Sequence, residues 1–131
     1  MAKRNVVKLD AAPVMFTVIG ISSHENDYRL TWSLNEQLGL TFVQSKSLIS
    51  SEKEFTCFVL EDDNQKLTLI SNRCNNGFLL EKYKTFDFIL KFDAELNEAE
   101  TQTWLRDLKR VSLVSTAFPI PVNKQVLQIL G

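Results

Sequence analysis

The chain has 131 residues, of which 44% are hydrophobic and 24% charged, and its formal net charge is −1. These values fit one folded domain with its own core, and they exclude low-complexity and fibrous classes. The near-zero charge argues against a dedicated nucleic-acid binder, which carries a basic stripe, but leaves a local basic patch open. We therefore expect residues 1–131 to form a single domain.

The apolar run at residues 14–21 predicts a central strand. Ser22 and Glu25 follow with the spacing of a capping box, which predicts that a helix begins there. This helix is expected to run to about Leu38, and Gly39 is placed to end it in the left-handed conformation.

One face of this predicted helix is formed by leucines four residues apart: Leu30, Leu34 and Leu38. Tyr28 and Trp32 flank that face at helical spacing. We therefore expect a helix that is more than half buried, with Asn35 pointing inward and requiring hydrogen-bond partners.

Strand patterns follow at residues 40–44, 55–60 and 66–71, and the polar residues 62–65 predict a hairpin loop between the last two. Residues 71–77 are rich in turn-forming types and predict a loop. Residues 86–92 alternate so that the phenylalanines share one side. This pattern predicts a strand with one core face and one mostly polar face.

A second helix is predicted to begin near Asn97, with Glu100 three residues later as an N-terminal signal. Residues 113–118 read as a strand, and Pro119 and Pro121 limit it to a sheet edge or a strand end. Residues 122–130 are expected to form a short terminal helix or strand.

This order of elements predicts an α+β fold: a mostly antiparallel sheet with two main helices packed on one face, as a two-layer sandwich. The strand at 86–92, the second helix and the strand at 113–118 resemble a βαβ unit. These two strands are therefore expected to be parallel if they share the sheet.

The chain lacks the nucleophile elbow, P-loop, dinucleotide-binding and HExxH motifs, and a lone His24 does not make a catalytic triad. His24, Cys57 and Cys74 are the only histidine and cysteines of the sequence, too few for the four ligands of a Cys/His zinc site, so we expect no such site within one chain. We expect no metal and no cofactor, and the balance favours a non-enzymatic protein. A disulfide between the two cysteines stays geometrically open, although nothing marks the chain as secreted. No apolar run approaches the length of a membrane span, so we expect a cytoplasmic protein.

Four polar residues at element ends are candidates for a ligand site: Arg29, Asn35, Arg73 and Asp87. Either arginine can hold an anionic group by paired hydrogen bonds. The alternative interpretation is structural: Arg29 pairs with Asp87 or Glu81 and braces the helix against the sheet, and Arg73 caps a turn.

Arg106, Lys109 and Arg110 form a small basic cluster on one flank of the second helix. Phosphate binding is possible there, but Asp107 interrupts the cluster and no aromatic platform on which bases could stack lies nearby in sequence. A solvated helix end is the favoured interpretation.

Three segments carry a family resemblance: Gly20-Ile21-Ser22, Asp27-Tyr28-Arg29-Leu30-x-Trp32-x-Leu34-Asn35 and Ser71-Asn72-Arg73. Together with Thr116-Ala117-Phe118, they resemble the IPExxVDY family of small Bacteroidota proteins. Phe86-Asp87-Phe88 matches the Val-Asp-Tyr end of the namesake motif, whereas the Ile-Pro-Glu part is degenerate around Glu81 and lacks the proline. The resemblance implies a cytoplasmic bacterial protein of shared fold without an established activity, and it supplies no catalytic residues.

Three functional hypotheses remain. The first is a protein-interaction module, with a homodimer through a sheet face or strand edge as one form. The second is a small anionic-ligand site or enzyme that uses Arg29, Arg73 and Asp87, with Asn35 or Tyr28 behind them. The third and weakest is an RNA-associated protein that uses the flank from Arg106 to Arg110.

Overall fold

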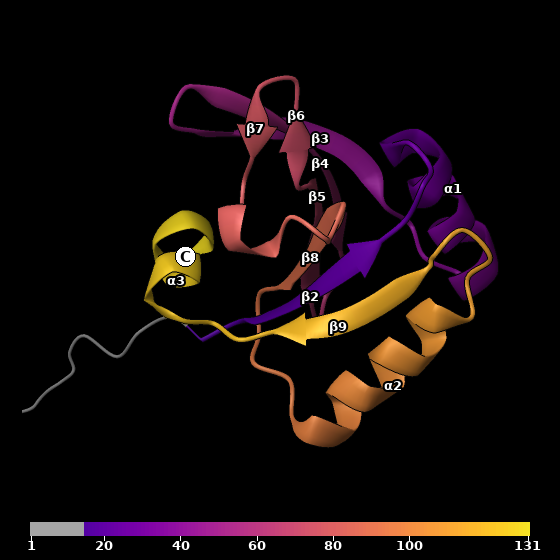
Figure 1. Ribbon diagram of the computed structural model, residues 1–131. Helices are drawn as coiled ribbons and strands as arrows, with labels where there is room; N and C mark the ends of the chain where they lie inside the picture. Colours follow the sequence, from indigo (N-terminus) through magenta and orange to yellow (C-terminus); the bar gives the residue numbers. More distant parts are fainter. Residues whose placement is uncertain (1–14) are drawn as a thin grey trace, which may run out of the picture.

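The computed structural model describes residues 15–131 and contains a six-stranded sheet in the order β3-β4-β5-β8-β2-β9 (Figure 1). Every neighbouring pair in this sheet is antiparallel. The strands are β2 (Thr17–Ser22), β3 (Val43–Ser50), β4 (Lys53–Glu61), β5 (Lys66–Ser71), β8 (Phe88–Phe92) and β9 (Thr116–Ile120). The helices are α1 (Asp27–Leu38), α2 (Glu98–Lys109), α3 (Lys124–Leu130) and the short 3-10 helix η1 (Glu81–Tyr83). The predicted α+β class is confirmed.

The two main helices, α1 and α2, pack on one face of the sheet, as predicted. Leu30 and Leu34 of α1 and Leu105 and Leu108 of α2 belong to the same buried cluster as Leu90 of β8. Burying a side chain of this size contributes roughly 1.5–3 kcal/mol. The leucine spacing in each helix is therefore what holds it to the sheet.

The opposite face of the sheet is also apolar, and this corrects the expectation of a mostly polar face for residues 86–92. Ile89 of β8 is fully buried there, together with Val18 and Ile70 from the neighbouring strands. Val126 and Leu130 of α3 cover this second cluster. The pattern is hidden in sequence because Ile89 stands between Asp87 and Lys91, and its cover comes from the distant end of the chain.

The predicted βαβ relation is confirmed in a split form. Both β8 and β9 pair antiparallel with β2, which lies between them, so β8 and β9 are parallel to each other. β9 is an edge strand and contains Pro119. Proline has no backbone N–H to donate to a neighbouring strand, so it is tolerated at a sheet edge.

At the other edge, β3 is longer than the strand predicted at 40–44. It runs to Ser50 and carries a bulge between Ser45 and Leu48. Its serines hide the strand pattern, because an edge strand can be polar on both sides. The predicted loop at 71–77 contains a small hairpin, β6 (Arg73–Cys74) paired with β7 (Gly77–Phe78).

The start of α1 differs from the prediction. Asn26 is the N-cap, and its side chain accepts a hydrogen bond from the Arg29 backbone N–H at 2.9 Å. Ser22 cannot serve as the cap because it still belongs to β2, where it pairs with Thr116 of β9. The predicted end is confirmed, since Gly39 has a φ of 65°.

The other predicted boundaries need only small changes. Val14 lies outside the described residues, and the first strand continues one residue beyond Ile21 to Ser22. Asn97 and Glu100 form the complete capping box of α2. The segment predicted as a terminal helix or strand is the helix α3. Within residues 15–131, no helix is both long enough and apolar enough to cross a membrane.

Candidate functional site

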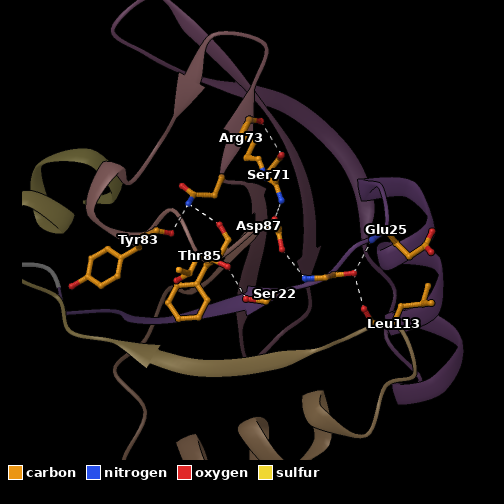
Figure 2. Close-up of polar contacts among 11 residues, drawn as sticks. Ser22, Glu25, Ser71, Arg73, Tyr83, Thr85, Asp87 and Leu113 are labelled. Atoms are coloured by element: carbon orange, nitrogen blue, oxygen red, sulfur yellow. Dashed lines mark hydrogen bonds and ion pairs between the residues drawn. The ribbon is translucent and has the colours of Figure 1, made fainter.

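Asp87 is the centre of a polar network where β2 and β5 end and β8 begins (Figure 2). Its backbone N–H donates to the Ile21 carbonyl, and its own carbonyl accepts from the Asn72 N–H, both at 2.9 Å. The carboxylate accepts a hydrogen bond from the Ser23 N–H at 2.8 Å through Oδ2, and its Oδ1 forms an ion pair with Arg73. Asp87 therefore joins two strands, a helix entry and the β6–β7 hairpin.

Ser23 extends this network to the turn before α1. Its side chain donates to the Leu113 carbonyl at 2.6 Å and accepts from the Glu25 N–H at 3.1 Å. The residue is 3% exposed, so these partners replace water for its polar groups.

Asn72 is fully buried beside Asp87 and organises the segment that leads into β8. Its Oδ1 accepts from the Leu80 N–H at 2.8 Å, and its Nδ2 donates to the carbonyls of Tyr83 and Phe86 at 3.0 and 2.9 Å. The sequence marks Asn72 only as a strand-end residue. Its partners lie 8 to 14 residues ahead, beyond the reach of any local motif.

An open cavity of about 540 Å³ lies over this network. Its lining includes the carboxylates of Glu25, Asp27 and Asp87, with Arg73 as the one lining arginine and His24 beside them. A second open cavity shares Asp27 and Arg73 and continues toward the β3–β4 hairpin. Because Arg73 is already paired with Asp87, and Asp27 and Glu25 also line the first cavity, it is an unfavourable site for an anion.

The structure brings two of the four predicted site residues together, Arg73 and Asp87, and separates the other two. Arg29 pairs with Glu25 in the turn just before α1, with Nε and Oε1 2.8 Å apart. Asn35 faces the start of β3, where its side chain donates to the Phe42 carbonyl and accepts from the Phe42 N–H. Its role is to hold the α1–β3 connection, which agrees with the predicted need for partners.

Glu81 of η1 does not pair with Arg29. Its Oε1 lies 3.5 Å from Nζ of Lys84. Among the side chains that the structure describes, no group of three or more His, Cys, Asp or Glu is arranged to hold a metal ion.

The two cysteines are free and differ in reactivity. Cys57 is 4% exposed, and burial raises the pKa of its thiol, whereas Cys74 is partly exposed on β6. Because the thiolate is the reactive form, we expect a thiol reagent to modify Cys74 alone in the folded protein. Mass spectrometry after limited labelling measures this, with the urea-unfolded protein as the two-site control. Equal labelling of both cysteines before unfolding would contradict this structure.

The aromatic residues of α1 form a second candidate site, which we call the α1–β3 surface: Tyr28, Arg29, Trp32, Val43 and Gln44. Tyr28 is 60% exposed and Trp32 65% exposed, so the predicted burial of this helix flank is wrong. The Tyr28 hydroxyl donates to Oε1 of Gln44 at 2.8 Å, and its ring meets Phe58 edge-on at 5.6 Å. Tyr28, Arg29 and Trp32 line an open cavity of about 470 Å³.

Comparison with known proteins assigns neither surface. No protein-family model matches the chain, and no curated protein matches it significantly. The resemblance to the IPExxVDY family therefore stays a prediction.

Proposed function

We propose that the protein is a non-enzymatic interaction module that binds a protein partner through the α1–β3 surface, with a second copy of the chain as the first partner to test. The observation that carries this proposal is the exposure of Tyr28 and Trp32, one helical turn apart, beside the edge strand β3. Trp, Tyr and Arg dominate the binding energy of protein interfaces, and Arg29 lines the same cavity as the two rings.

The Tyr28 ring is held in place before any partner binds. Its hydrogen bond to Gln44 and its contact with Phe58 fix both ends of the side chain. A side chain that is already ordered loses little conformational entropy on binding, so more of its contact energy appears as affinity.

The neighbouring edge strand adds a second mode of contact. β3 ends the sheet, with β4 on its one paired side, so its outward backbone groups can accept another strand. Val43 at its start and Ile49 near its end are 61% and 72% exposed and can pack against such a strand. The bulge after Ser45 limits how much of β3 can pair.

The small-ligand alternative has less support. Arg73 and Asp87 do meet at a cavity, but they neutralise each other and the remaining lining is acidic. The network at Asp87 is adequately explained as a brace between strands. We also propose a cytoplasmic location, for which the two free cysteines are the supporting observation.

The test is sedimentation velocity over a range of protein concentrations, with the Tyr28→Ala/Trp32→Ala double variant beside the wild type. We expect a concentration-dependent dimer whose dissociation constant rises at least about 30-fold in the double variant, the effect of losing one strong interface residue. Phe118→Ala, which removes an aromatic residue of similar exposure from β9, is the matched control and should dimerise normally. Two results together would reject the proposal. The wild type would be a monomer at every concentration, and it would retain no partner from native lysate that the double variant fails to retain.

A further inference from the structure

Three aromatic rings lie next to one another near the β9 edge of the sheet, on the face opposite α1 and α2. Tyr83 stacks on Phe86 with centroids 6.4 Å apart and planes at 26°, and Phe86 meets Phe118 at 6.4 Å and 51°. Phe118 is 51% exposed, and the other two rings are partly exposed. Residues from η1, the segment before β8, and β9 thus make one aromatic row.

Gly20 of β2 leaves the space in which the Phe86 ring of this row packs. It pairs with Phe118 in the β2–β9 register, and a Cβ atom on Gly20 would lie 2.5 Å from the Phe86 ring. The ring therefore packs directly against the backbone of the sheet, where any side chain would displace it.

Both ends of the aromatic row are positively charged. At the β9 end, Nζ of Lys109 lies 5.3 Å from the centre of the Phe118 ring, with Arg106 and Arg110 on the same turn of α2. Asp107 is the carboxylate of that turn, and its contacts to the two arginines are long, 3.7 and 4.0 Å. At the other end, Lys82 and Lys84 are the sequence neighbours of Tyr83. The Lys84 ammonium lies 5.6 Å from the centre of the Phe78 ring and 3.5 Å from Oε1 of Glu81.

We propose that this β9-edge surface, formed by Tyr83, Phe86, Phe118 and the basic ends, binds single-stranded nucleic acid. Such proteins combine aromatic rings on which bases stack with cations that follow the phosphates. The aromatic residue nearest the basic cluster in sequence, Trp104, packs edge-on against Phe92, and the fold supplies another by placing Phe118 under Lys109. The positive charge that would attract the phosphates is confined to this surface, because the whole chain has a net charge of −1.

This surface is separate from the α1–β3 surface, so its test is independent of the proposed function. Fluorescence anisotropy measures binding of labelled oligouridylate and oligodeoxythymidylate of about 12 nucleotides, a length that suits a single small domain. We expect binding at about 50 mM salt that weakens steeply toward 200 mM, because phosphate contacts release counterions. The two oligonucleotides distinguish RNA from DNA as the bound strand.

Variants of exposed residues separate stacking from simple charge attraction. Phe118→Ala should weaken binding about tenfold, whereas Phe118→Tyr should retain it. Lys109→Ala should lower the slope of log affinity against log salt by about one. Met15→Ala, which removes an apolar side chain of similar exposure outside both surfaces, is the matched control. The absence of binding at low salt overturns the proposal. Binding by Phe118→Ala with wild-type affinity also overturns it, because the protein would then attract any polyanion without base stacking.

Discussion

Replacing Asn72 with alanine should lower the free energy of unfolding by about 3–5 kcal/mol, a large share of the total stability of a domain this size. The alanine leaves the Leu80 N–H and the carbonyls of Tyr83 and Phe86 without their partner. Each such group costs about 1–3 kcal/mol when it stays buried, and the sum is reduced by local rearrangement. Urea unfolding followed by circular dichroism measures the change.

Asn75→Ala is the matched control for this substitution, because Asn75 lies in the same segment and is exposed. It should change the free energy of unfolding by less than about 0.5 kcal/mol. If Asn72→Ala were equally mild, the buried network around Asn72 would not exist in solution. The same change should also weaken the proposed nucleic-acid surface, since Asn72 holds the backbone of both Tyr83 and Phe86.

Asp87→Ala should lower the free energy of unfolding by about 2–3 kcal/mol, and most of this loss should come from Ser23 rather than from Arg73. Arg73 has 57% of its side chain exposed, so water screens its ion pair and limits it to roughly 1 kcal/mol. The Ser23 N–H is different, because Ser23 is 3% exposed and loses a charged acceptor.

A double-mutant cycle between Asp87→Ala and Arg73→Ala tests this division. We expect a coupling energy below about 1 kcal/mol, with Arg73→Ala alone nearly neutral. Asp87→Asn should lie between wild type and alanine, because the amide oxygen can still accept from Ser23. A coupling that accounts for most of the Asp87→Ala effect would show that the ion pair, not the strand brace, dominates.

The candidate site was only partly predictable from the sequence. Arg73 and Asp87 are predicted site residues because they are polar groups at element ends, and the antiparallel pairing of β5 with β8 brings them together. The predicted partner of Arg29 is wrong, since Arg29 pairs with Glu25 in the turn just before α1 rather than with Asp87 or Glu81. Asn72 was undervalued because its partners belong to a segment with no regular pattern.

Local periodicity predicts the two main helices and most strands, and the order of these elements predicts the α+β class and the parallel relation of β8 to β9. These features follow from side-chain spacing and from caps such as Asn97 and Gly39, where the deciding contacts lie within a few residues. Only the tertiary structure decided that Ile89 is buried and that Tyr28 and Trp32 are exposed. Periodicity locates a face of an element but not what covers it: residues of α3 join Ile89 in one buried cluster, while Trp32 is 65% exposed. The sequence alone suggests an interaction module, but the surface proposed for partner binding depends on that exposed face and so required the tertiary structure.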